Sequence, residues 1–127
     1  MVYSHNKEYE ESGRTLEKGA SLFEETGEIA GAAWQYGNIG SNYRDTGRYK
    51  DALEQYFKAF DIFENLNDST GMADQCANIA YIYVMLKKNE EGILWYTKSL
   101  LLYYKLKDAS KAEMVRLNLS TLDNRQN

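Results

Sequence analysis

Apolar residues recur at helical spacing along nearly the whole chain and predict a series of helices of similar length. The clearest stripe lies in residues 49–66, where apolar side chains follow one another at three- and four-residue steps. Its members are Ala52, Leu53, Tyr56, Ala59, Phe60 and Phe63. The pattern predicts six helices, at about residues 6–25, 29–45, 49–66, 70–87, 90–107 and 109–122.

The chain contains no proline, so its predicted helix ends are marked by glycine and capping residues instead. Gly27 and Gly47 follow the first two helices and suit the left-handed conformation that ends a helix. Residues 67–70 are rich in cap residues and open the fourth helix. Asn89 and Asp108 are predicted to cap the fifth and sixth helices.

The sequence repeats itself at a step of forty residues. Asn38 to Tyr43 reads Asn-Ile-Gly-Ser-Asn-Tyr, and Asn78 to Tyr83 reads Asn-Ile-Ala-Tyr-Ile-Tyr. Other pairs at this offset are Ala33 with Ala73, Leu53 with Ile93, Tyr56 with Tyr96, Lys58 with Lys98, Ile62 with Leu102, Leu66 with Leu106 and Asp68 with Asp108. Such a period is typical of solenoids, whose units bury their apolar faces against neighbouring units. The predicted fold class is therefore all-α, an α-solenoid of antiparallel helix pairs with about six helices.

The repeat predicts a single helical domain over residues 1–127. Its expected parts are an unpaired helix at 6–26, a first repeat at 28–67, a second repeat at 68–107 and a capping helix at 108–122. The last helix has Arg116, Ser120 and Asp123 where the earlier repeats have packing residues, and burying unpaired polar groups is costly. We therefore expect the array to end with this helix.

The recurring residues resemble the signature of the tetratricopeptide repeat. The first copy has Tyr36, Ile39-Gly40, Tyr43, Ala52, Tyr56 and Ala59, and the second has Cys76, Ile79-Ala80, Tyr83, Gly92, Tyr96 and Ser99. The forty-residue period, the missing proline and the run Gly37 to Gly40 are similar to a longer-repeat branch of that family. This branch occurs in polarity adaptors and in bacterial peptide-responsive regulators.

Composition narrows the range of partners. The chain has 15 Lys and Arg against 19 Asp and Glu, so no basic footprint favours nucleic acid or an anionic membrane. No apolar run approaches the ~18 residues of a membrane span, and residues 1–20 are too polar for a signal peptide. Cys76 is the only cysteine, which excludes a disulfide within the chain and fits a cytoplasmic location.

Candidate catalytic groups are scarce. His5 is the only histidine and lies in a start that we expect to be disordered, so a nucleophile–histidine arrangement cannot be built. Cys76 falls at a core position and is expected to be buried and inert. The sequence contains neither a glycine-rich phosphate loop nor metal-ligand spacing. We expect no enzymatic activity, no cofactor and no metal.

The resemblance implies a peptide-binding groove lined by the first helix of each pair. Its candidate residues are Trp34, Asn38, Ser41, Arg44, Asn78, Tyr81, Met85, Met114 and Asn118. The three asparagines recur at the forty-residue step, and their amides can hold a peptide backbone, because each carries a donor and an acceptor. Alternatively, each asparagine bonds the neighbouring repeat. The aromatic and methionine residues favour a partly apolar peptide or helix as ligand.

A second candidate surface lies in residues 94–104. Leu94, Thr97, Leu101 and Tyr104 follow a heptad-like spacing away from the core stripe, and Trp95 adds to them. Forty residues earlier the corresponding positions hold Glu54, Phe57, Asp61 and Glu64. A contiguous apolar row is a docking signal, so it predicts a homodimer or partner interface. Incidental exposure and coverage by the chain's own tail are the alternatives.

These features predict a non-catalytic tetratricopeptide adaptor or scaffold that binds a protein or peptide. An alternative is the peptide-sensing segment of a larger signalling or transcription regulator. A sensor must change conformation when its peptide binds, whereas an adaptor need not.

Overall fold

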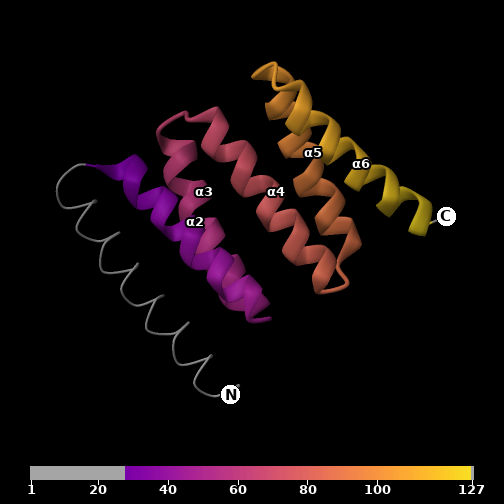
Figure 1. Ribbon diagram of the computed structural model, residues 1–127, viewed down its shortest axis with the longest axis horizontal. Helices are drawn as coiled ribbons and strands as arrows, with labels where there is room; N and C mark the ends of the chain where they lie inside the picture. The colour runs from indigo at the N-terminus through magenta and orange to yellow at the C-terminus, as the bar shows by residue number, and fades with distance from the viewer. Residues whose placement is uncertain (1–27, 127) are drawn as a thin grey trace. The chain divides into compact units, whose positions relative to one another are not determined.

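The computed structural model describes residues 28–126, with side chains to Leu122, and this part of the chain is entirely helical. Five helices follow one another: α2 (Ile29–Asp45), α3 (Tyr49–Asn65), α4 (Ser69–Met85), α5 (Asn89–Lys105) and α6 (Ala109–Gln126) (Figure 1). The predicted all-α, tetratricopeptide-like class is confirmed. The helix predicted at 6–26 lies outside the described residues.

The predicted helix boundaries agree with the structure to within two residues, except that α6 extends to Gln126 instead of ending near Leu122. Asp108 caps α6 as predicted, since its carboxylate accepts a hydrogen bond from the Lys111 backbone N–H at 3.1 Å. Asp68 caps α4 in the same way, accepting from the Gly71 N–H at 3.0 Å.

The predicted cap at Asn89 is wrong. Lys88 occupies the N-cap position and makes no side-chain cap bond, and Asn89 is already the first helical residue. The preceding turn is three residues long and therefore leaves only Lys88 at the cap. Glu90 and Glu91 in the first turn suit the positive end of the helix dipole, which compensates for the missing cap.

A residue with positive φ stands in every turn between the described helices. These residues are Gly47, Asn67, Lys87 and Lys107, and they are spaced twenty residues apart. Between α4 and α5 the Lys87 N–H donates to the Val84 carbonyl at 3.0 Å, and the Lys88 N–H donates to the Tyr83 carbonyl at 2.8 Å. These two bonds form the Schellman motif, which satisfies the last carbonyl groups of the helix.

Replacing Lys87 with glycine is expected to raise the free energy of unfolding by about 0.5–1 kcal/mol, because only glycine adopts left-handed φ without steric cost. Lys87 has a φ of 65° and is exposed, so the change removes strain and no packing. Lys105→Gly is the matched control, because Lys105 is exposed but is the last helical residue of α5, so that glycine there should lower the free energy of unfolding instead of raising it. Urea unfolding measures both, and a destabilised Lys87→Gly protein would contradict the strain argument.

The chain divides into two compact units, the first ending at Leu66 and the second beginning at Asn67. In the first unit α2 and α3 pack together as a helical hairpin (Figure 1). The ring of Tyr56 is fully buried against Gly40, where an added Cβ would lie 2.8 Å from the ring. Glycine at position 40 therefore gives Tyr56 its space. The Tyr56 hydroxyl is 2.9 Å from Ser41 Oγ.

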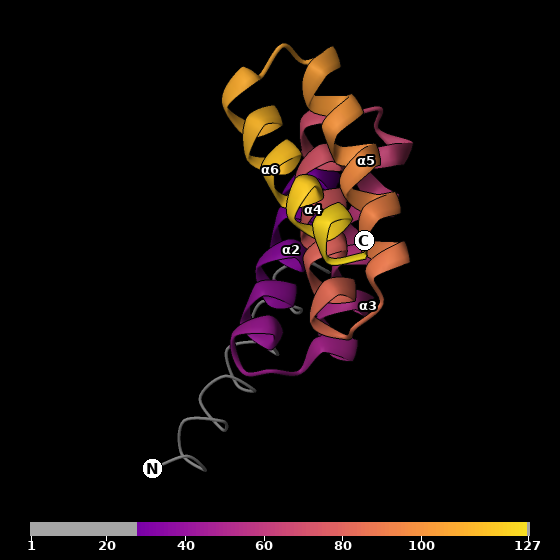
Figure 2. The ribbon, with the colours of Figure 1, turned by 90° about the vertical axis from the view of Figure 1, so that its right-hand side faces the viewer.

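In the second unit α5 packs against both α4 and α6 (Figure 2). Gly92 on α5 makes the close approach here, because an added Cβ would lie 2.7 Å from Val84 Cγ2. The buried Ser99 hydroxyl donates to the Ala73 carbonyl at 2.9 Å. The core of the unit consists of Ala73, Ala80, Tyr96, Tyr103, Ala112, Val115 and Leu122.

Candidate protein-binding surfaces

The predicted groove residues of the first unit form one stripe along α2. Trp34 and Asn38 are exposed, and Ser41 and Arg44 are half-buried. One edge of the Trp34 indole packs against Phe63 of α3, with 4.8 Å between ring centroids and 63° between planes. The indole is therefore fixed on one side while 41% of the residue stays open to solvent.

The predicted groove residues of the second unit lie on α4 and α6. Asn78, Tyr81 and Met85 share one face of α4, and Met114 and Asn118 are one turn apart on α6. Tyr81, Met85 and Met114 are between 40% and 58% exposed. The structure thus brings each helix's candidate residues to its surface.

The alternative role of the asparagines, a bond to the neighbouring repeat, is not seen among the described residues. Asn78 donates to Gln75 Oε1 at 3.4 Å, within its own helix. Within residues 28–122 neither Asn38 nor Asn118 makes a side-chain hydrogen bond or ion pair, and both are exposed. Their amide groups are therefore available to a ligand.

A polar cluster that sequence reasoning missed ties α4 to α5 and α6. The Asp74 carboxylate accepts a hydrogen bond from the Tyr103 hydroxyl and forms an ion pair with Lys111 Nζ at 3.3 Å. Burial, followed by the hydrogen bond to Asp74, raises the pKa of Tyr103 well above its ordinary value. The cluster thus links α4 to α5 through Tyr103 and to α6 through Lys111.

The same positions in the first unit are apolar. Forty residues before Asp74 and Tyr103 stand Trp34 and Phe63, which meet edge to face. A hydrogen-bonded pair in the second unit thus replaces an aromatic pair in the first. A comparison of the two repeats at these positions could have revealed the Asp74–Tyr103 pair, because both residues of the pair change from apolar to polar together.

The predicted row on α5 is also at the surface. Leu94, Leu101 and Tyr104 are between 53% and 62% exposed, which is high for large apolar residues. Trp95 is half-buried, and the Lys98 ammonium lies over its ring at 4.4 Å from the centroid. The row therefore presents three large apolar side chains in line.

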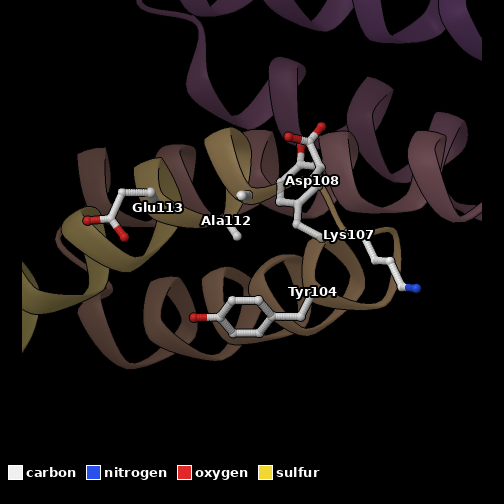
Figure 3. A pocket seen from close by; sticks show the side chains of 7 residues that line it. Tyr104, Lys107, Asp108, Ala112 and Glu113 are labelled. Atoms are coloured by element: carbon white, nitrogen blue, oxygen red, sulfur yellow. The ribbon is translucent and has the colours of Figure 1, made fainter.

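A cavity of about 390 Å³ adjoins this row where α5 turns into α6. Figure 3 shows the Tyr104 ring on one side and Ala112 and Glu113 of α6 on the other. The carboxylate of Asp108 caps α6, and that of Glu113 accepts from Arg116 Nε at 2.8 Å. The residues that line the cavity are Tyr103, Tyr104, Lys107, Asp108, Ala109, Ala112 and Glu113.

Three further features bear on function in the described part of the chain: its cysteine, any metal-ligand cluster and any membrane-spanning helix. Cys76 is fully buried, as predicted. Among these residues no three His, Cys, Asp or Glu side chains gather to hold a metal ion. None of the described helices is both long and apolar enough to span a bilayer.

Comparison with known proteins supports the resemblance in sequence and fold. The crystal structure of the apo form of RapI is similar to 98% of this chain, with a TM-score of 0.84 and 23% identity. This chain covers only 45% of RapI and thus spans less than half of its length. The N-terminal domain of stress-induced protein-1 from C. elegans covers 85% of the chain, and the chain covers 97% of that domain, with a TM-score of 0.55 and 10% identity.

No curated protein matches the chain in sequence. The family model described as "Tetratricopeptide repeat" matches residues 1–65, which is about half of the chain. The matched range includes most of the first copy of the repeat, where the signature residues are the more complete. The chain therefore belongs to the tetratricopeptide repeat family.

Proposed function

We propose that the chain is a non-catalytic adaptor or scaffold that binds a protein segment or peptide through the exposed faces of α2, α4 and α6. The observation that carries this proposal is the repeated presence of large, exposed apolar side chains on these faces. They are Trp34, Tyr81, Met85 and Met114. Trp34 and Met114 stand at equivalent places two repeat steps apart, and Tyr81 and Met85 add to the exposed face of α4. Exposed large apolar residues that gather on a surface mark an interaction site, and repeats of this family typically serve protein interaction.

The chemistry of these faces favours a partly apolar ligand. Trp34 in the first unit, and Tyr81 and Met114 in the second, can each receive an apolar anchor of an extended peptide or of an amphipathic helix. Asn38 and Asn118 supply amide donors and acceptors for a ligand backbone. The nearby cation of Lys111 is paired with Asp74, which disfavours a strongly acidic peptide as ligand.

Peptide binding can be tested by selecting peptides from a random phage-displayed library on the purified chain and measuring their affinities by fluorescence polarisation. We expect Trp34→Ala and Asn78→Ala each to weaken binding about tenfold, because anchors in such surfaces carry most of the affinity. Glu54→Ala is the control, since Glu54 is exposed on α3 outside the proposed surface. Thermal melting must show that all variants remain folded.

Unchanged affinity in both Trp34→Ala and Asn78→Ala would show that these faces do not contact the peptide. Equal loss in Glu54→Ala would indicate a binding surface on α3 instead.

The second candidate function is a peptide-sensing segment of a larger regulator. It is favoured by the forty-residue period and the run Gly37 to Gly40, which resemble the longer-repeat branch that occurs in bacterial peptide-responsive regulators. A sensor requires that the peptide bind one arrangement of the two units better than another. Fluorophores on Asp61→Cys in the first unit and Glu113→Cys in the second would report that change by energy transfer. A peptide that binds without changing the transfer supports the adaptor.

A further inference from the structure

We infer that the exposed face of α5 binds a second copy of the chain, with the two α5 helices side by side and antiparallel. This inference is independent of the groove, because the α5 row and the proposed ligand face use different residues. Leu94, Leu101 and Tyr104 form its apolar part, and each is more than half exposed. The Thr97 hydroxyl donates to the Ile93 carbonyl at 2.7 Å, so this residue presents its methyl group without an unpaired polar atom.

The row is arranged symmetrically about the midpoint between Thr97 and Lys98. Leu94 and Leu101 are equally far from that midpoint, and so are Glu90 and Lys105. A twofold axis through the midpoint therefore places Leu94 of one copy against Leu101 of the other. A homodimer interface of this kind uses the same patch on both subunits and must be complementary to itself.

Charge complementarity selects the antiparallel direction. Glu90 and Glu91 are exposed at the start of α5, and Lys105 is exposed at its end. In the antiparallel arrangement Lys105 of one copy faces Glu90 and Glu91 of the other, at both ends of the interface. A parallel arrangement would place Glu90 and Glu91 of the two copies together, and like charges that face each other weaken association.

Lys98 lies next to the proposed twofold axis, where two equal charges would meet. Its ammonium is drawn aside, because it lies over the ring of Trp95 at 4.4 Å from the centroid. The lysine stem can then contribute apolar area near the axis while the charge stays at the edge.

The equivalent face of α3 is not built for this contact. Glu54, Asp61 and Glu64 are exposed at the positions that correspond to Leu94, Leu101 and Tyr104. Two such faces would repel each other. If the partner were a different protein or a further helix, α5 would still need an apolar row. It would not need charges placed symmetrically about the centre of that row. The symmetry is therefore the reason to assign the face to a second copy.

The dimer is expected to be weak, because one helix from each copy makes a small interface. A dissociation constant of about 10–100 µM is reasonable for such a contact. Sedimentation velocity on the full chain between about 5 and 500 µM should therefore show a shift from monomer to dimer. A chain that stays monomeric over this range would overturn the inference and leave the row to another partner.

Charge reversals and an apolar-to-acidic substitution test whether the exposed face of α5 forms the dimer interface. Leu101→Glu should abolish dimer formation, and Lys105→Glu should weaken it at least tenfold. The triple variant Glu90→Lys, Glu91→Lys, Lys105→Glu should recover the wild-type dissociation constant, because the antiparallel pairs are restored with their signs exchanged. A dimer that survives Leu101→Glu, or a triple variant that stays monomeric while folded, would contradict the assignment.

Crosslinking tests whether the two α5 helices run antiparallel. Position 97 lies next to its counterpart across the twofold axis, so Thr97→Cys should form a disulfide-linked dimer under mild oxidation. Position 91 lies about 20 Å along the axis from its counterpart at 1.5 Å rise per residue, so Glu91→Cys should not. Cys76 is fully buried and does not compete. Equal crosslinking of the two variants, or crosslinking of Glu91→Cys alone, would exclude the antiparallel geometry.

Discussion

Replacing Tyr56 with alanine is expected to lower the free energy of unfolding by about 3–5 kcal/mol, the range for an aromatic residue removed from a core. Tyr56 is fully buried, and its ring fills the space that Gly40 leaves open on α2. The substitution therefore opens a cavity between the only two described helices of the first unit. Urea unfolding followed by circular dichroism measures the loss.

Two further variants separate packing from hydrogen bonding at this site. Tyr56→Phe keeps the ring and removes the hydroxyl, with its hydrogen bonds to Ser41 and Arg44, and should cost about 0.5–1.5 kcal/mol. Tyr81→Ala removes the same side chain from an exposed position and should change stability by less than about 0.5 kcal/mol. A Tyr56→Ala protein as stable as Tyr81→Ala would show that the contact with Gly40 does not hold the hairpin together.

Replacing Asp74 with alanine is expected to cost about 2 kcal/mol, because the change leaves the Tyr103 hydroxyl without its acceptor inside the second unit. Lys111 also loses its ion-pair partner, although its side chain is 43% exposed and water replaces much of that interaction. The variant Asp74→Ala, Tyr103→Phe removes both members of the hydrogen bond. It should be less destabilised than the sum of the two single variants.

The double-mutant cycle gives the coupling between Asp74 and Tyr103 directly, and we expect about 1–2 kcal/mol. Asp45→Ala serves as a control, because Asp45 is an exposed carboxylate whose Oδ1 pairs with Nε of the adjacent Arg44 at 3.1 Å. Its cost should stay below about 0.5 kcal/mol. Additive effects of Asp74→Ala and Tyr103→Phe would mean that the two residues do not stabilise the unit together.

The helices and their core faces were predictable because local signals agree along the chain. The stripe of residues 49–66 predicts which side chains α3 buries, and Tyr56, Ala59, Phe60 and Phe63 are indeed buried. The forty-residue repeat then predicts the same face for α5, where Tyr96 and Tyr103 are buried. Periodicity works here because each helix has one buried stripe.

The polar cluster could not be predicted from periodicity. Asp74 and Tyr103 are twenty-nine residues apart on different helices, and helical spacing says nothing about partners across helices. Periodicity along residues 70–87 gives no partner for Asp74. The cap at Asn89 was wrong for a related reason, since no glycine marks Lys87 as the left-handed residue that sets the length of the turn.

The even spacing of the left-handed residues at 47, 67, 87 and 107 gives the chain two different periods. Each helix with its turn is twenty residues long, but side-chain character repeats only after forty. Gly40 is matched by the small Ala80, whereas position 60, halfway between them, holds the buried Phe60. A duplication or deletion of forty residues with ends in the turns would therefore bring small residues such as Gly40 and Ala80 to matching positions, whereas one of twenty would bring bulky residues to positions that need small ones. Recombination within the gene can thus lengthen or shorten such an array in steps of one helix pair.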